Sequence, residues 1–389
     1  MGFLSGQMTF GRYQVEGGPQ EFGLEHLETL AKFAIGQIES SSTDGLDVGF
    51  IAGQHLFDLN FTADKNLINE FLHFGIRVDT NKVPAPLRQA WLQIELALLA
   101  AENPSGRPTK TQKQQAKESV NERCEEEAKS GKFRRMKQFS VLWDARDSML
   151  YLGSTSAAAG EHVAALLNQA FEVELKRLTA GQMAQAWAGP NRKKTALAEI
   201  NASRFQESQA WREPAWMANQ FDTQDYLGNE FLLWLWWYLE TQSDTVLLSD
   251  GSEVTGMLHK TLSLECPVGE TGKDTMSAES PVKLPEARQA IRSGKLPRKC
   301  GMILSRFGEQ YQFVLQAEAF QINGAKIDTT EPSGKNAREE RIETLRHFME
   351  TLDLLYGAFC ERRIGDEWPE DLDQIANWVQ EDVEQTVAK

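Results

Sequence analysis

Apolar residues along the chain follow the two periods that mark strands and helices. Alternation of apolar and polar positions predicts strands over 7–15 and 71–78. Apolar residues at three- and four-residue steps predict amphipathic helices over 24–38 and 87–99. The early part of the chain therefore mixes both kinds of element.

The same mixture continues to the end of the chain. Further strands are expected over 139–143, 149–153, 245–248, 257–264, 300–307 and 311–317. Further helices are expected over 163–175, 231–239, 286–293 and 342–359. Because strands and helices alternate without long uniform blocks, the pattern predicts a mixed α/β or α+β fold.

One expected helix, over 109–130, is unusually polar. Its apolar residues recur every four positions, at Ala116, Val120, Cys124 and Ala128. Thr109 or Thr111 could cap its start, and Gly131 suits a left-handed end. Such a helix can bury only one thin edge, so the rest must face solvent or a partner.

Polar, turn-rich stretches divide the expected elements. Residues 186–229 read as a docked irregular insertion that carries Trp187, Trp211 and Trp216, and residues 267–285 read as a flexible loop. We therefore expect four consecutive regions. They are an N-terminal α/β region (1–106), a region with the basic helix and central hairpin (107–185), an insertion-bearing region (186–282) and a C-terminal α/β region with an acidic tail (283–389).

Charge changes this picture because it is unevenly distributed. The formal net charge is −15, which taken alone argues against nucleic acid. Yet residues 107–137 hold ten cations and five acids, and residues 283–299 hold six cations and one acid, a net charge of +5 in each stretch. Residues 192–194 form a third basic cluster. Net charge describes the whole molecule, whereas binding depends on one face.

The first basic stretch suits contact with phosphate, since its acids gather in the middle and both ends are almost purely basic. Phe133 stands alone among these cations and could insert at a base step or stack on a base. The candidate DNA-binding residues are Arg107, Lys110, Lys113, Lys117, Lys132, Phe133, Arg134 and Arg135. Two plainer interpretations stay open. The helix could be a solvated face with pairs such as Glu125–Lys129, and Phe133 could be a small packing anchor.

Candidate enzyme chemistry is thin. The chain contains no phosphate-binding glycine loop, dinucleotide fingerprint or nucleophile elbow. Four scattered cysteines and six scattered histidines have no metal-ligand spacing, so we expect neither metal nor cofactor. Asp144 and Asp147 could hold Mg²⁺ as nuclease acids do, although a turn-stabilising role fits them better. We expect a protein that is not an enzyme.

No feature indicates export or membrane insertion. The N-terminus lacks the basic start and apolar run of a signal peptide. The longest apolar run, 231–239, has nine residues, whereas a bilayer span needs about 20. We expect a cytoplasmic protein with no membrane partner.

The order of the motifs adds more than any single one. Arg107, Lys110 and Lys113 precede the polar helix, and Lys132-Phe133-Arg134-Arg135 and Val141-Leu142-Trp143-Asp144 follow it. Gly49-Phe50-Ile51 and Val83-Pro84 lie upstream, and Ala290-Ile291-Arg292-Ser293-Gly294-Lys295-Leu296-Pro297 lies downstream. Through most of its length the chain resembles the bacterial recombination-associated protein RdgC family.

The resemblance implies a horseshoe-shaped α/β protomer that pairs head to head into a ring. Such a ring would encircle duplex DNA without sequence preference, associate with the nucleoid and restrain RecA-dependent recombination. The family's basic lining corresponds to residues 107–117 here and its protruding aromatic to Phe133. The insertions 186–229 and 267–282 have no clear counterpart in the family.

Two rival functions remain from the sequence. One is a DNA exonuclease that uses Asp144 and Asp147 with a third acid. The other is a protein-interaction module whose acidic tail, 366–389, mimics DNA or docks a basic partner. The leading expectation is a homodimer that binds double-stranded DNA and affects RecA indirectly, through the DNA.

Overall fold

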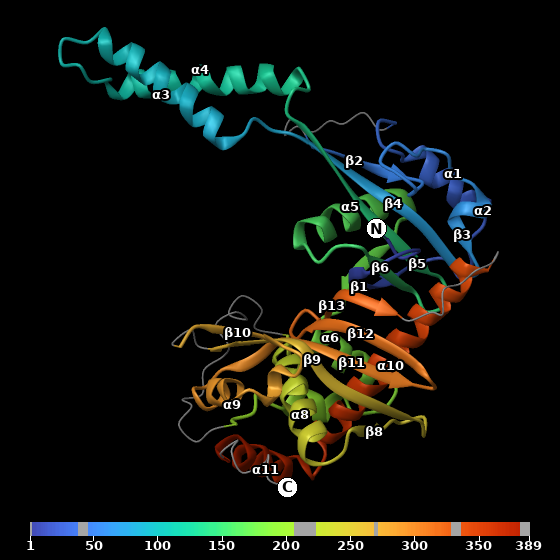
Figure 1. Ribbon diagram of the computed structural model, residues 1–389. Coiled ribbons are helices and arrows are strands. Elements are labelled where there is room, and N and C mark those ends of the chain that lie inside the picture. Colours follow the sequence, from blue (N-terminus) through green and yellow to red (C-terminus); the bar gives the residue numbers. More distant parts are fainter. Residues whose placement is uncertain (1, 38–45, 206–222, 268–270, 328–335, 382–389) are drawn as a thin grey trace. The chain divides into compact units, whose positions relative to one another are not determined.

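A computed structural model of the protein describes residues 2–37, 46–205, 223–267, 271–327 and 336–381 (Figure 1). The fold is mixed α/β, as the alternating pattern predicted, and its strand pairs are antiparallel. Backbone contacts divide the chain into two compact units, whereas the four expected regions followed composition. Unit 1 comprises Met1–Gln20, Leu142–Gly160 and Glu174–Lys389, and unit 2 comprises Glu21–Val141 and Glu161–Val173.

Unit 1 is built on a long antiparallel sheet. Its strands are β1 (Met8–Glu16), β6 (Met149–Leu152), β7 (Glu174–Arg177), β8 (Thr245–Leu247), β9 (Glu253–Glu265), β10 (Lys273–Ala278), β11 (Leu296–Arg306), β12 (Glu309–Gln316) and β13 (Gln321–Ile327). Their order is β10-β9-β11-β12-β13-β1-β6, with β7 paired to β1 and β8 paired to β9.

Helices supply the rest of the core of unit 1. They are α6 (Ala180–Ala188), α7 (Lys194–Glu199), α8 (Tyr226–Thr241), α9 (Pro285–Arg292), α10 (Ala337–Ile364) and α11 (Trp368–Gln380). The ring of Phe231 in α8 lies 5.2 Å from that of Tyr356 and 5.6 Å from that of Phe359 in α10. Beside them, Arg363 Nε donates to Glu230 Oε2 at 2.6 Å, and both side chains are buried.

Unit 2 has a smaller sheet and more helix. Its elements are α1 (Leu24–Lys32), β2 (Leu46–Ile51), α2 (Ala63–Asn66), β3 (Leu67–Ile68), β4 (Phe71–Asn81), α3 (Ala85–Ala101), α4 (Lys110–Lys129), most of β5 (Arg134–Asp144) and most of α5 (Ala157–Phe171). Within this unit β4 lies between β2 and β5. Phe50 contacts Phe74 and Phe171 and forms the centre of the apolar face.

Most expected elements are confirmed, with small shifts at their ends, but four predictions were wrong. The stretch 186–229, expected to be irregular, includes helix α7. The helix expected over 163–175 ends at Phe171, and strand β7 follows it. The helix expected over 24–38 ends at Lys32, and the amide of Ile35 donates instead to the carbonyl of Phe50. Part of the loop expected over 267–285 is strand β10, paired along 260–265 of β9. An edge strand pairs through its backbone, so β10 needs no apolar side chains and carries no sequence signal.

The structure describes part of the stretch 186–229 and part of the acidic tail. Trp187 lies in α6 and the expected buried helix 231–239 is the centre of α8, whereas Trp211 and Trp216 lie outside the described residues. In the acidic tail, α11 buries Trp368, Ile375, Trp378 and Val379. None of the helices in the described part of the chain is long and apolar enough to cross a membrane.

Candidate nucleic-acid interface

The basic tract forms the second half of a helical hairpin in unit 2. Helices α3 and α4 are inserted between the neighbouring strands β4 and β5 and pack against each other (Figure 1). Ala116 and Val120 are buried in this contact, as the four-residue stripe predicted. At its edge the guanidinium of Arg123 lies 4.2 Å from the ring centre of Trp91. The hairpin therefore presents most of α4 to solvent.

Local hydrogen bonds fix the turn between the two helices. Thr109 is the N-cap of α4, and its side chain accepts from the amide of Gln112. The Gln112 side chain accepts in return from the amide of Thr109 at 2.9 Å, which completes a capping box. It also accepts from the Asn103 side chain at 2.6 Å. At the other end Gly131 has a φ of +76°, the left-handed end that was expected.

Four cations gather at the tip of this hairpin, and we call them the tip cluster: Arg107, Lys110, Lys113 and Lys117. All four are exposed. Within the described part of the chain, none of them has a salt-bridge partner. The three lysines are three and four residues apart, so they share one face of α4, beside the stripe that packs on α3.

The order of charges along α4 opposes helix stability. Lys110 and Lys113 occupy the first turn, where the helix dipole favours acidic residues, and no acid is present there. The acids Glu118, Glu122 and Glu125 follow on another face. Each misplaced charge costs about 0.3–1 kcal/mol when exposed. Helix stability therefore gives no reason for lysines at this position, whereas a bound anion would be favoured by both the lysines and the helix terminus.

The remaining candidate residues lie at the base of the hairpin, and we call them the root cluster: Lys132, Phe133, Arg134 and Arg135. Lys132 is 65% exposed and lies 3.5 Å from Glu127, a surface pair of little strength. Its ammonium also lies 5.7 Å from the ring centre of Phe133. Phe133 is half-buried and lies at the base of the hairpin, whereas the resemblance implied a protruding aromatic.

Arg134 differs from the other candidates because it is held by a buried acid. Its Nε and Nη2 donate to Asp79 Oδ2 at 3.0 and 2.5 Å, and Asp79 also accepts two hydrogen bonds from Arg77. Burial alone would raise the pKa of Asp79, but the hydrogen bonds and charges of Arg77 and Arg134 hold it below its ordinary value. Arg134 therefore stabilises unit 2 and has less charge left for a ligand.

The sequence placed the tip and root clusters in one tract, but α4 separates them. From Lys113 to Lys129 the chain follows sixteen residues of α4, which corresponds to about 24 Å at about 1.5 Å per residue. Lys113 is thus about seven base pairs of B-DNA away from the end of α4 that carries the root cluster, at about 3.4 Å per pair. A single duplex could contact both clusters only if its axis ran along α4.

The second basic stretch, 283–299, lies in unit 1 and is used internally. Arg288 binds Glu240 and stacks on Trp378, with its guanidinium 4.9 Å from the ring centre. Arg292 Nε donates to the carbonyl of Val379 at 2.6 Å, at the end of α11. Lys295 pairs with Asp274, and Arg298 pairs with Glu265 and Glu318. Four of its six cations therefore hold unit 1 together.

The two acids considered as nuclease ligands serve the turn between β5 and β6. Asp144 Oδ1 accepts from the amides of Arg146 and Asp147, and Oδ2 accepts from Arg346 at 3.1 Å. Burial raises the pKa of Asp144, and Arg346 partly offsets this effect. The turn-stabilising interpretation of Asp144 is confirmed. No group of acids, histidines and cysteines suited to a metal occurs among the described residues.

Sequence reasoning missed one cation at the root of the hairpin. Lys82 is exposed and follows Asn81, whose side chain donates to the carbonyl of Ala128 near the end of α4. Lys82 therefore lies near the root cluster, although it precedes Lys132 by fifty residues. Only a prediction that β4 and β5 are neighbours could have found it. No protein-family model matches this chain, and a search of curated proteins finds no significant relative.

Proposed function

We propose that this chain binds double-stranded DNA without sequence preference, through phosphate contacts made by the α3–α4 hairpin. One observation carries the proposal: four exposed cations without salt bridges to described residues gather at the tip of a hairpin in a protein of net charge −15. Phosphates are the ligands that such cations favour, and their contacts fix position without reading bases.

The rest of the charge distribution supports binding at this place. The other long basic stretch is occupied by ion pairs and carbonyl contacts within unit 1. The acids of α4 and the acidic remainder of the chain repel a polyanion elsewhere. The lysines in the first turn of α4 lower helix stability, which is a reason to look for a ligand there.

The root cluster has a secondary part in the proposal. Lys132 and Arg135 are exposed and add positive charge where α4 meets β5. Phe133 would reach a base step only after leaving its half-buried position, so we assign it a contribution smaller than that of the lysines.

The resemblance to the RdgC family adds the biological setting of the proposal. On that basis the chain forms a homodimer, associates with the nucleoid and modulates RecA-dependent recombination by occupying DNA. A dimer would bring two tip clusters to one duplex and would double the number of phosphates contacted. Light scattering behind size-exclusion chromatography measures the mass, and a monomer at micromolar concentration would contradict this part.

The test of DNA binding uses fluorescence anisotropy with a fluorescein-labelled duplex of mixed sequence at low salt. We expect binding that does not change when the sequence is scrambled. The variant Lys110→Ala/Lys113→Ala/Lys117→Ala should bind more weakly. Absence of binding to any duplex at low salt would overturn the proposal.

A nuclease is the weaker candidate, because both oxygens of Asp144 are already engaged by turn amides and Arg346. Incubating end-labelled DNA with the protein and Mg²⁺ or Mn²⁺ tests it. Cleavage that disappears in Asp144→Ala, with the fold intact by circular dichroism, would favour the nuclease over the binding protein.

A further inference from the structure

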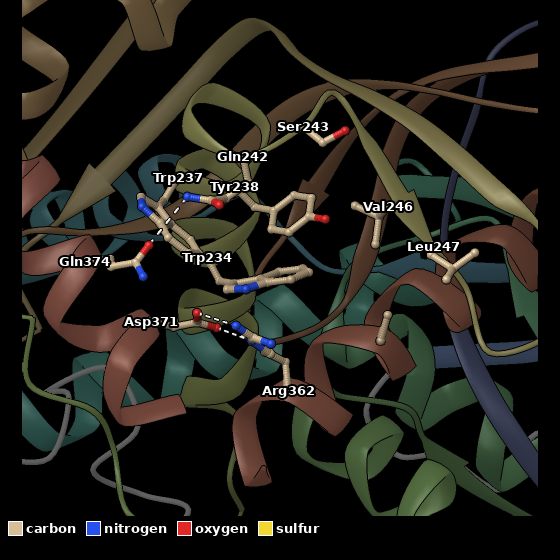
Figure 2. A pocket seen from close by; sticks show the side chains of 11 residues that line it. Trp234, Trp237, Tyr238, Gln242, Ser243, Val246, Leu247, Arg362, Asp371 and Gln374 are labelled. Atoms are coloured by element: carbon tan, nitrogen blue, oxygen red, sulfur yellow. Dashed lines mark hydrogen bonds and ion pairs between the residues drawn. The ribbon is translucent and has the colours of Figure 1, made fainter. Parts of the chain in front are cut away.

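Unit 1 contains a cavity that DNA binding does not use. Its volume is about 470 Å³, within the range of about 300–1,000 Å³ typical of ligand sites. Helix α8 contributes Trp234, Trp237 and Tyr238, while Arg362 comes from α10 and Asp371 from α11. Figure 2 shows the indole of Trp234 between Tyr238 and Arg362.

One polar atom in the wall of this cavity has no partner. Trp234 is 3% exposed, and its indole Nε1 is buried with no acceptor among the described residues. A buried donor without an acceptor costs about 1–3 kcal/mol, so acceptors are rarely missing. Arg362, in contrast, is fully engaged, since it donates to both oxygens of Asp371, at 2.5 and 2.8 Å. The one cation of the lining therefore offers no free charge to a ligand.

The cavity opens beside an edge strand. Val246 and Leu247 of β8 line it, and β9 is the one strand with which β8 pairs in the described part of the sheet. The amide of Gly256 donates to the carbonyl of Asp244, and the amide of Leu248 donates to the carbonyl of Ser252. These two hydrogen-bonded pairs lie on either side of the pair Val246–Val254. Hydrogen-bonded and non-hydrogen-bonded pairs alternate in an antiparallel ladder, so Val246 is the residue whose backbone hydrogen-bonds to β9. The N–H and C=O of Leu247 therefore point away from β9.

Leu247 is also 66% exposed, which is high for a large apolar residue. An extended peptide added to β8 would take up the outward N–H and C=O of Leu247. Its alternate side chains would then enter the cavity next to Val246. Backbone pairing gives such complexes their affinity, and the pocket beside the edge selects the side chain.

Charge around the opening indicates the chemistry of the peptide. Exposed acids adjoin the lining residues at Asp244, Glu253, Glu367 and Glu370. Arg362 is the single cation of the lining, and Asp371 and Glu367 neutralise it. The opening is therefore acidic around an aromatic interior.

We propose that the β8 edge and this cavity bind an extended segment of a partner protein that carries a large apolar side chain flanked by lysine or arginine. The segment adds a strand to β8 and places the apolar side chain against Trp234 and Tyr238. This site is independent of the hairpin and of its proposed DNA binding.

The probe is a library of random heptapeptides displayed on phage and selected on the full-length protein. Enriched peptides are synthesised with a fluorescein label and measured by anisotropy. We expect apolar residues at alternate positions with basic neighbours. The proposal would be overturned if no peptide were enriched, or if the enriched peptides were acidic.

Four variants separate the parts of the site. Ala358→Leu fills the cavity from α10 and should weaken the selected peptides at least tenfold, whereas Ala186→Leu on the exposed face of α6 should not. Leu247→Pro removes the outward N–H and leaves the bonds to β9, so it should weaken binding more than Leu247→Ala. Equal affinity of all variants would refute the site.

A second copy of this chain is the rival occupant. If Ala358→Leu changes the mass of the protein in solution without any peptide, the cavity is a contact between copies and the peptide proposal is wrong. A mass unchanged by Ala358→Leu, together with lost peptide affinity, supports it.

Discussion

Replacing three lysines of the tip cluster should change the salt dependence of DNA binding by a calculable amount. Each phosphate that a protein neutralises contributes about −0.9 to the slope of log affinity against log salt. Lys110, Lys113 and Lys117 are exposed and share one face, so each can meet a phosphate. Their replacement by alanine should make the slope less steep by about 2.7.

This slope translates into a large change over an ordinary salt range. When salt rises fourfold, from about 50 to about 200 mM, the wild-type affinity should fall about 40-fold more than that of the variant. The two affinities should therefore converge as salt increases. Alanine is the best helix former, so α4 should remain folded, which circular dichroism verifies. Anisotropy titrations of one duplex at five salt concentrations measure both slopes.

A matched control removes the same charge from unit 1. Lys273, Lys283 and Lys326 are exposed and lie outside the hairpin. Their triple alanine variant has the same net charge as the tip variant and should retain the wild-type slope. Equal loss of slope in both variants would show that overall charge, and not the tip cluster, controls binding. An unchanged slope in the tip variant would refute phosphate contact by these lysines.

Three further predictions concern stability and reactivity. Arg363→Leu leaves Glu230 charged and buried, so urea unfolding should show a loss of about 3–5 kcal/mol, and a loss below about 1 would contradict the pairing. Arg134→Gln should lower the free energy of unfolding of the protein at about pH 7. Because the pKa of Asp79 is lowered in the fold, that difference is present above its unfolded value of about 3.9 and should shrink as pH falls below it; a constant difference would refute the linkage. Maleimide at neutral pH should label Cys124 fast, since the other three cysteines are buried and burial raises the pKa of Cys300 to about 12; mass spectrometry showing several fast sites would contradict this.

The sequence was informative wherever the determining contacts are local. Helix α4 could be predicted because Thr109 and Gly131 bound a segment whose apolar stripe, at Ala116 and Val120, has the helical period. Such signals lie within a few residues of the structure that they determine. The same holds for Asp144, whose role in a turn follows from its immediate neighbours.

Where a residue or strand contacts a partner that is distant in sequence, the sequence pattern did not predict the contact. The two basic stretches look alike in composition, yet Arg288 binds Glu240 and Arg292 binds the end of α11. Arg134 was grouped with the free cations because Asp79 lies on another strand. Strand β10 was missed for the same reason, since its stability comes from pairing with β9 and its side chains carry no apolar period. Counting charges along the sequence predicts neither a distant ion-pair partner nor a distant strand partner.

The insertion of the α3–α4 hairpin between two neighbouring strands has a consequence for how this protein can evolve. In the hairpin, α3 has no fully buried side chain and α4 has two, so substitutions at its exposed positions remove no buried side chain. Surface substitutions of this kind usually change stability by less than about 0.5 kcal/mol. Selection can therefore alter the charge of the hairpin, one residue at a time, without passing through variants that fail to fold.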